Sequence, residues 1–460
     1  MDKNTLWSLR LGFSAKQSQN IQKNGLEKFL SASFKAPFDE QLPAFLKDDP
    51  KTFAELKAMR DSIKDDSEAQ KKNLKKQVQN AIELRIWWIK NIQSSDFPLR
   101  EKMTVFWHNH FVSTSQKVKL NYSIYEHNMI LRRNTFGNFR TLTKEILQSN
   151  AMVRYLDNND NRKGKINENL SRELLELFTL GIGNYSEADI KNGAKALAGL
   201  TPGENGAKYR PRLEDNDTIT YFGKTGTFKL DEIVDIIFEQ PSAPYLITRK
   251  ILKWFLYDEP DESLVKYYGD YLKKSDFEIQ PLLVKMFTEE SAKNTSGTKI
   301  KDPLTYILQL SSELNANVQP RAIAIFLKQQ GMDLFNQPNV KGWDGGRSWL
   351  TSQIFLQRNN VADLLCSGKT INRKIKEVNS DEMPDEKRFL SVKLDWNDKG
   401  DNLDVIADLS NRLLFTIDTN LQNDFEKLLK YDFNPKSPGA DNAVLRLFND
   451  MVKTPEFQLI

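Results

Sequence analysis

Two of the chain's three histidines, His108 and His110, lie two positions apart in the stretch FWHNHF. The third, His127, follows a short way downstream. Imidazoles act as general bases, proton shuttles and metal ligands, so this stretch is the first candidate for chemistry. A His-x-His pair converges on one metal ion from a strand, where residues two apart share a face, but not from a regular helix. The element that carries the pair therefore decides which chemistry is available.

A helix is the element that the spacing predicts. Pro98 is able to begin a helix, and the apolar residues after it recur with helical spacing on one face. His108 lies two residues before His110 and points about 200° away from it around the helix. His110 is then either a satisfied core histidine or a base, and His108 is either on the helix surface or a partner for a carboxylate or ligand. The shared face consists of Met103, Phe106, Trp107, His110 and Phe111.

A second candidate is the stretch DNNDNRKGKINE at residues 157–168, which resembles the calcium loop of a helix–loop–helix motif in its spacing. Arg162 replaces the required glycine at position 6, and Lys163 and Lys165 add positive charge. The alternative is an asparagine-rich turn whose side chains bond its own backbone and cap the next helix. The predicted ligands of calcium or another divalent cation are Asp157, Asn159 and Asn161 at positions 1, 3 and 5, and Glu168 at position 12.

A third candidate follows directly in NENLSRELLEL, where Glu173 and Glu176 are neighbours on adjacent helical turns and Arg172 lies four positions before Glu176. These side chains form either a surface ion-pair set or an inward-facing site that reaches the histidine helix. Helical bundles do build metal sites from carboxylates and histidines, but their paired Glu-x-x-His pattern is absent from this stretch.

The elements that must position these residues are mostly helices, because apolar residues recur with helical spacing through most segments. Strand patterns are limited to residues 218–223 and 389–396. We therefore expect a mainly α fold, a multi-helical globular array with at most one small β hairpin or short sheet. The charged region 47–76 is expected to form a helical arm, and the polar segments 288–302 and 367–388 are expected to be linkers or insertions.

Composition narrows the class of protein. The net charge of +4 gives no strong signal for nucleic-acid binding, which needs a concentrated basic face. The single cysteine, Cys366, fits a reducing compartment. No stretch approaches the apolar length of a membrane span, and the first residues lack the apolar core of a signal peptide. We expect a soluble protein of the cytoplasm.

Several stretches together resemble a bacterial family, the domain-of-unknown-function 1800 family. They are REKMTVFWHNHF, GNFRTLTKEIL, YLDNNDNRKGKINENLSRELLELFTLGIGNYSEADI, FGKTGTF, PNVKGWDGGRSWL and TPEFQLI. The resemblance implies one family-wide unit over residues 1–460. Within it we distinguish an N-terminal arm (1–76), a helical core with the His and acidic motifs (77–287) and a C-terminal part (303–460) with a variable insertion near 367–400. Many relatives look secreted and occur beside sulfatase-like proteins, so the resemblance also implies a sulfatase-like partner.

Two departures from the family pattern bear on chemistry. Many relatives carry histidine where this chain has Phe178, and His-Asp where it has Asn216-Asp217. The reduced constellation that remains is His108, His110, Glu173 and Asp217. One hypothesis is a hydrolase-like enzyme with a histidine as base or ligand and the two carboxylates as partners. The other is a non-enzymatic binding or assembly protein with the calcium-like loop.

Overall fold

The computed structural model describes residues 1–368 and 390–460, and it confirms the mainly α fold. Its helices in the N-terminal half are α1 (Lys3–Leu11), α2 (Ser18–Asn24), α3 (Leu26–Lys35), α4 (Phe53–Ser62), α5 (Ser67–Ser94), α6 (Leu99–His110), α7 (Ser115–Val118), α8 (Asn121–Arg133), α9 (Phe139–Leu147), α10 (Asn150–Tyr155), α11 (Asn169–Glu173) and α12 (Glu187–Ala196). A π-helical segment, η4 (Leu174–Thr179), continues α11 without a break.

The later helices are α13 (Leu230–Phe238), α14 (Ala243–Phe255), α15 (Glu262–Lys274), α16 (Ile279–Ser291), α17 (Pro303–Glu313), α18 (Pro320–Gln329), α19 (Ser352–Cys366), α20 (Asn402–Leu413), α21 (Thr419–Leu428) and α22 (Ala440–Met451). Short 3₁₀ turns are η1 (Ala15–Gln17), η2 (Ala44–Leu46), η3 (Asn158–Asp160), η5 (Gly346–Trp349) and η7 (Pro455–Phe457).

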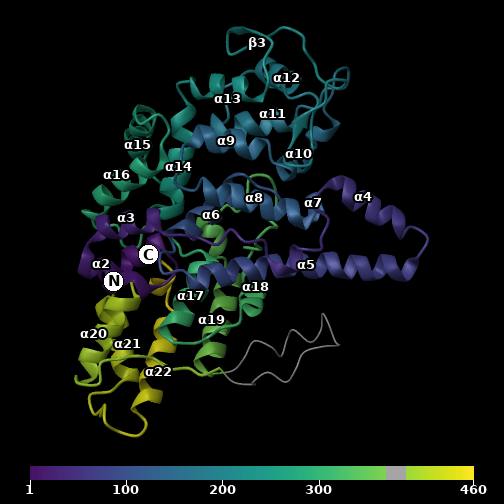
Figure 1. Ribbon diagram of the computed structural model, residues 1–460. Helices are drawn as coiled ribbons and strands as arrows, with labels where there is room; N and C mark the ends of the chain where they lie inside the picture. The colour runs from purple at the N-terminus through teal and green to yellow at the C-terminus, as the bar shows by residue number, and fades with distance from the viewer. Residues whose placement is uncertain (369–389) are drawn as a thin grey trace.

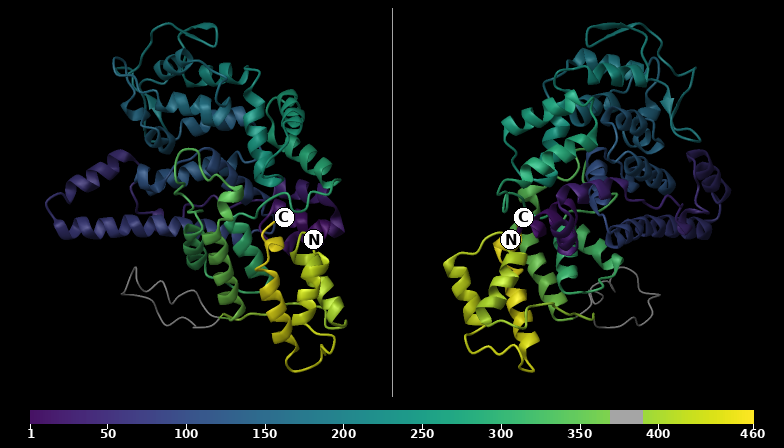
Figure 2. Two further views of the ribbon diagram at one scale, coloured as in Figure 1. Left: turned by 180° about the vertical axis from the view of Figure 1, so that it is seen from behind. Right: turned by 60° about the vertical axis from the view of Figure 1, so that its left-hand side comes forward.

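The helices are arranged around α6 and α8 (Figure 1). Helices α9 to α13 lie above this centre, α14 to α16 descend along one side, and α17 to α19 lie below it. Helices α20 to α22 pack on one another at the lower end, where α22 also contacts α19, while α4 and the first part of α5 project sideways as an arm (Figures 1 and 2). Helix α5 continues from the arm into the body, so position 76 falls inside one helix.

Two small antiparallel sheets occur among the described residues, one more than we expected. Strand β1 (Leu200–Thr201) pairs with β2 (Lys208–Tyr209), and β3 (Ile219–Tyr221) pairs with β4 (Lys224–Gly226). The strand expected at 218–223 is thus confirmed. The strand expected at 389–396 is wrong for residues 390–396, which run without a neighbouring strand, and residue 389 lies outside the described part.

The polar segment 288–302 is partly helical, because α16 extends to Ser291, and its last residues are tied to the core. Ile300 forms a β-bridge with Leu459, and Arg10 of α1 donates to the carbonyl oxygens of Thr295 and Ile460. Most of the insertion expected at 367–388 lies outside the described residues. None of the described helices has the length and apolar character that crossing a membrane requires.

Candidate functional site

The histidine stretch forms the last turn of α6, which begins after Pro98 and ends at His110. As the spacing predicted, the two imidazoles lie on different sides of the helix. The ring of His110 stacks on Phe106, with centroids 6.2 Å apart, whereas the ring of His108 lies 5.5 Å from Trp88 and 5.1 Å from His127. The surface position considered for His108 is wrong, because α6 is covered on nearly every side and His108 is fully buried.

Two of the histidines hold the buried turn that follows α6. His108 Nε2 donates to the carbonyl oxygen of Ser113 (3.0 Å), and His127 Nε2 donates to that of Phe111 (2.8 Å). A carbonyl oxygen only accepts, so Nε2 carries the hydrogen of each neutral ring. The Nδ1 of His127 then accepts from the hydroxyl of Ser149 (3.3 Å). These rings satisfy backbone groups that a buried loop could not expose to water.

His110 is bonded differently, because its second nitrogen meets a lysine. Its Nε2 donates to the carbonyl oxygen of Phe178 (3.1 Å), which leaves a lone pair on Nδ1. The Nζ of Lys250 lies 3.2 Å from that Nδ1 and donates to the carbonyl oxygen of Leu177 (2.8 Å). Lys250 belongs to α14, so this pair joins two helices that are 140 positions apart in the sequence.

The π-helical segment η4 explains why these carbonyl oxygens need partners. The last carbonyl groups of a helical run have no N–H group of the same helix to bond. His110 and Lys250 supply those donors for Phe178 and Leu177, while the hydroxyl of Thr179 donates to the carbonyl oxygen of Leu174 (2.6 Å). A positive charge also suits the negative end of the helix dipole. Single π-helical turns occur often at functional sites.

Burial controls the protonation of this cluster. It lowers the pKa of His108 to about 4, and the pKa values of His110 and His127 also fall well below the usual histidine range. Lys250 adds to the effect on His110, because a neighbouring cation opposes a second positive charge. Burial likewise lowers the pKa of Lys250 to about 8. The three imidazoles are therefore neutral at pH 7, and a larger fraction of the Lys250 amine is neutral there than in a free lysine.

The glycine-rich stretch GWDGGRSWL closes over the same end of α6. The side-chain amide of Asn109 accepts from the backbone N–H of Trp343 (2.6 Å) and donates to its carbonyl oxygen (3.3 Å). Gln337 donates to the carbonyl oxygen of His108 (3.2 Å). Gly342 has a left-handed backbone (φ 85°), and a Cβ atom there would collide with Asn109. Stretches separated by more than 200 positions thus meet at the end of α6.

Glu173 lies one turn before Leu177 on the helical run that carries η4, and it is half-buried. Burial and then the charge of Glu176 raise the pKa of Glu173, while Lys341 opposes them. The structure shows no hydrogen bond between Glu173 and a histidine. Arg172 pairs with Glu168 (3.2 Å) and Glu187 (2.9 Å) rather than with the Glu173 and Glu176 pair that its spacing suggested.

Asp217 lies at the surface and forms an ion pair with Lys163 (3.0 Å), which lowers the pKa of Asp217. It forms no hydrogen bond or ion pair with His108, His110 or Glu173. The four residues of the reduced constellation are thus not brought together as one set.

The 157–168 loop uses its polar side chains within the protein. Asn161 is fully buried; its amide donates to the carbonyl oxygen of Ala194 (2.8 Å) and accepts from the backbone N–H of Asn167 (3.0 Å). The other three predicted ligands face different partners: Asp157 pairs with Lys117 (2.8 Å), Asn159 donates to Asp160 (2.9 Å) and Glu168 pairs with Arg172. Within residues 1–368 and 390–460, no cluster of three His, Cys, Asp or Glu side chains is placed to hold a metal ion.

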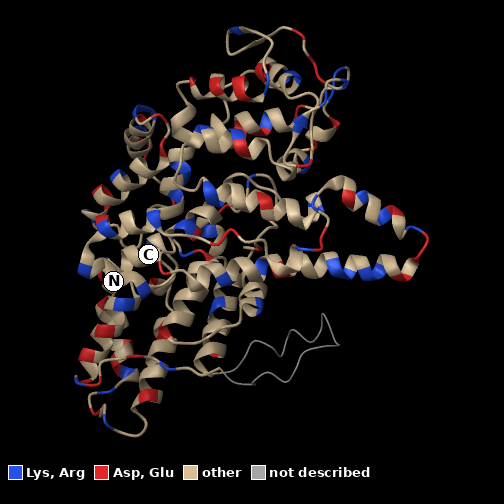
Figure 3. Ribbon diagram, in the orientation of Figure 1, with Lys and Arg blue, Asp and Glu red and all other residues tan. Residues whose placement is uncertain are grey.

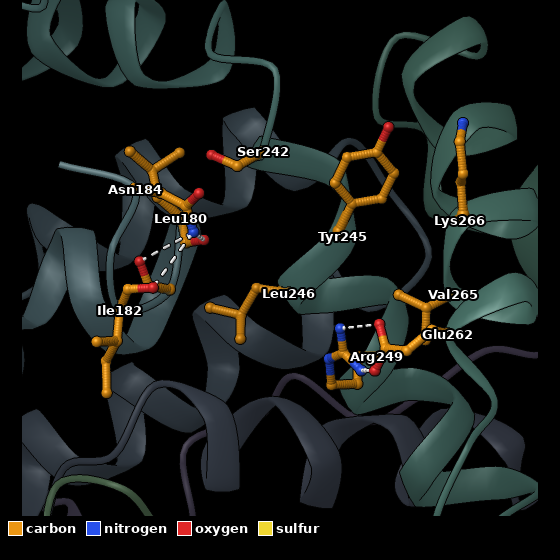
Figure 4. A pocket seen from close by; sticks show the side chains of 11 residues that line it. Leu180, Ile182, Asn184, Ser242, Tyr245, Leu246, Arg249, Glu262, Val265 and Lys266 are labelled. Carbon is orange, nitrogen blue, oxygen red and sulfur yellow. Dashed lines mark hydrogen bonds and ion pairs between the residues drawn. The ribbon is translucent and has the colours of Figure 1, made fainter.

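A hollow of about 640 Å³ opens beside η4, between the turn after it and helices α14 and α15 (Figure 4). Leu246 and Val265 contribute apolar surface, and Arg249 pairs with Glu262 at one side (2.7 Å). Lys250 directly follows Arg249 and lies one turn beyond Leu246 on α14, although it does not line the hollow itself. The hollow and the His110–Lys250 pair thus share one helix.

Sequence reasoning missed Lys250, although a signal was present. In APYLITRKILKWF, Lys250 lies three positions after Ile247 and four before Trp254, both buried on the inner face of α14. A lysine that lies three or four positions from such buried residues shares their face of the helix. It is therefore buried with them, and its charge then needs partners.

Fold and site together define a multi-helical protein with a buried histidine cluster, one member of which bonds a lysine with a lowered pKa. The model of a family described as "Protein of unknown function (DUF1800)" matches residues 6–459, and the chain belongs to this family. The resemblance seen in the sequence is thereby confirmed over nearly the full length. No curated protein and no solved structure matches the chain.

Proposed function

We propose that the protein is a hydrolase-like enzyme whose base is Lys250, positioned by His110. The observation that carries the proposal is the contact between Lys250 Nζ and the unprotonated Nδ1 of His110. An amine with a pKa of about 8 is partly neutral at physiological pH, and groups that titrate near the working pH are the most effective general bases. Lys250 also keeps part of its side chain open to solvent.

In this mechanism the neutral amine of Lys250 removes a proton from water, and the resulting hydroxide attacks an acyl or phosphoryl centre. The ammonium group then returns the proton to the leaving group. His110 accepts a hydrogen bond from the lysine and fixes its direction, so it acts as a positioning residue. Glu173, whose pKa is raised by burial, supplies a second titratable group one turn away along the helix. This arrangement replaces the His–Glu pairing that the sequence suggested.

The test measures turnover of activated ester, amide and phosphoester substrates by the purified protein. Lys250→Arg keeps a donor for Leu177 but removes the amine that can lose its proton, because arginine stays charged. We expect this variant to lose activity by about 10²-fold or more. Lys253→Met, on the exposed face of the same helix, is expected to retain it. Absence of turnover with every substrate class, or full activity of Lys250→Arg, would contradict the proposal.

The alternative of a binding or assembly protein with a calcium-like loop has less support from the geometry, because the loop's side chains are bonded within the protein. The sulfatase-like partner and the cytoplasmic location stay predictions of the sequence.

A further inference from the structure

The projecting arm carries apolar side chains that nothing in the described structure covers. In α5, Leu74 is 66% exposed and Val78 is 53% exposed, among the highest values for large apolar residues in the described chain. The two lie four positions apart, so they share one face of the helix. This part of α5 extends away from the body together with α4 (Figures 1 and 2).

The same face is covered where α5 enters the body. Arg85 lies seven positions after Val78 and therefore on the same side of the helix. It forms an ion pair with Asp333 (2.7 Å) in the segment after α18, and α18 packs along α5. The face about 200° from Leu74 is polar and carries the exposed Lys72 and Lys76. The exposed apolar pair thus continues a side of α5 that is already used for helix packing.

Positive charge surrounds the apolar pair. Lys71 and Lys75 are exposed on the same face as Leu74 and Val78, and the basic stretch is visible along α5 in Figure 3. Lys71 has an intrahelical partner in Glu68 (3.0 Å), whereas neither Lys72 nor Lys75 forms an ion pair within the described residues. Two apolar anchors one turn apart, flanked by the cations of Lys71 and Lys75, are complementary to an apolar groove with an acidic rim.

We propose that the face of α5 formed by Lys71, Leu74, Lys75 and Val78 is a docking surface for a partner protein that presents an apolar groove with an acidic rim. Leu74 and Val78 enter the groove as anchors four positions apart, and the lysines meet carboxylates at its edge. A membrane surface fits less well, because an interfacial helix needs a broader apolar face and the arm carries acidic residues at 65–68. This surface is independent of the Lys250 site.

The experiment places the photoreactive amino acid benzoylphenylalanine at position 74 or 78 in cells that make the full chain. Position 76, where Lys76 is exposed about 200° around α5 from Leu74 and Val78, is the matched control. We expect one adduct of defined mass at 74 and 78 and none at 76. Mass spectrometry then locates the cross-link on the partner, which we expect to lie between apolar residues and Asp or Glu.

The purified partner is then titrated with the wild-type chain and two double variants. We expect Leu74→Ser with Val78→Ser to weaken binding at least tenfold, and Lys71→Glu with Lys75→Glu to do so most strongly at low salt. Because these positions are exposed, we expect the substitutions to leave the fold intact. Thermal unfolding of each variant checks this expectation. The proposal is overturned by no adduct, by equal adducts at 76, by an adduct of two copies of this chain, by cross-links to lipid only, or by salt-insensitive binding.

Discussion

The three buried histidines make the protein sensitive to mild acid. In the unfolded chain each imidazole titrates near pH 6.5, whereas in the folded protein the pKa of His108 is about 4 and those of His110 and His127 are also lowered. When the pKa of an imidazole is lower in the folded protein than in the unfolded chain, the unfolded chain binds more protons. Stability is therefore complete above pH 6.5 and is lost as the pH falls below it.

The size of the effect follows from the same values. Moving from pH 7 to pH 5 costs about 2 kcal/mol for His108, which stays neutral in the folded state over this range, and His110 and His127 add losses in the same direction. Folded domains are typically stable by about 5–15 kcal/mol, so this loss is large. Glu173 and Glu313, whose pKa values burial raises, act in the opposite direction. The effect must therefore be measured for the histidines one at a time.

Two measurements test the reasoning. The imidazole signals of ¹³C-histidine-labelled protein, only three in number, should not titrate between pH 7.5 and 5.5. In urea unfolding, His108→Gln should reduce the pH dependence of the unfolding free energy by about 1 kcal/mol per pH unit between pH 6 and 5. A folded-state signal with a midpoint near pH 6.5, or an unchanged slope in the variant, would refute the reasoning.

Three further outcomes are expected. Burial lowers the pKa of Lys250 from 10.5 to about 8, so its contribution to the unfolding free energy increases as the pH rises from 8 to 10.5. In urea unfolding over this pH range, the unfolding free energy of Lys250→Met should therefore increase less than that of the wild type. Gly342→Ala should lower the unfolding free energy by roughly 1–3 kcal/mol, because the backbone there is left-handed and the new Cβ atom would collide with Asn109. The control Gly439→Ala should change the unfolding free energy little, because Gly439 has a negative φ and open space around it. Millimolar calcium should leave the melting temperatures of the wild type and Glu168→Gln unchanged, because the loop's side chains are bonded elsewhere; a rise of several degrees in the wild type alone would restore the calcium hypothesis.

Local spacing predicted the parts of the fold that depend on neighbours in the sequence. The phase of α6 and the strand pattern at 218–223 both follow from residues a few positions apart. The complete burial of His108 does not, because its cover comes from Trp88 of α5 and from Phe335, more than 200 positions away.

In the candidate site, too, the features that depend on distant packing were not predictable from local spacing. The spacing of the 157–168 loop suggested a cation, but the buried amide of Asn161 is bonded to Ala194, a residue of α12. Lys250 likewise meets His110 only because α14 packs beside the end of α6. A single sequence shows which side chains are able to bond, and the packing of distant helices decides which partner each one receives.

The contacts of Arg10 with Thr295 and Ile460 constrain how the chain folds. The bond to Ile460 joins groups that are 450 positions apart. The β-bridge between Ile300 and Leu459 holds the same C-terminal residues against the segment that contains Thr295. During synthesis α1 leaves the ribosome long before these partners exist. The face of α1 that is buried in the folded protein therefore stays exposed in the nascent chain until nearly all of these residues have been made. Contacts of such long sequence separation slow folding and prolong the exposure of apolar surface. We expect the nascent chain to depend on chaperones until the segment around Leu459 is in place.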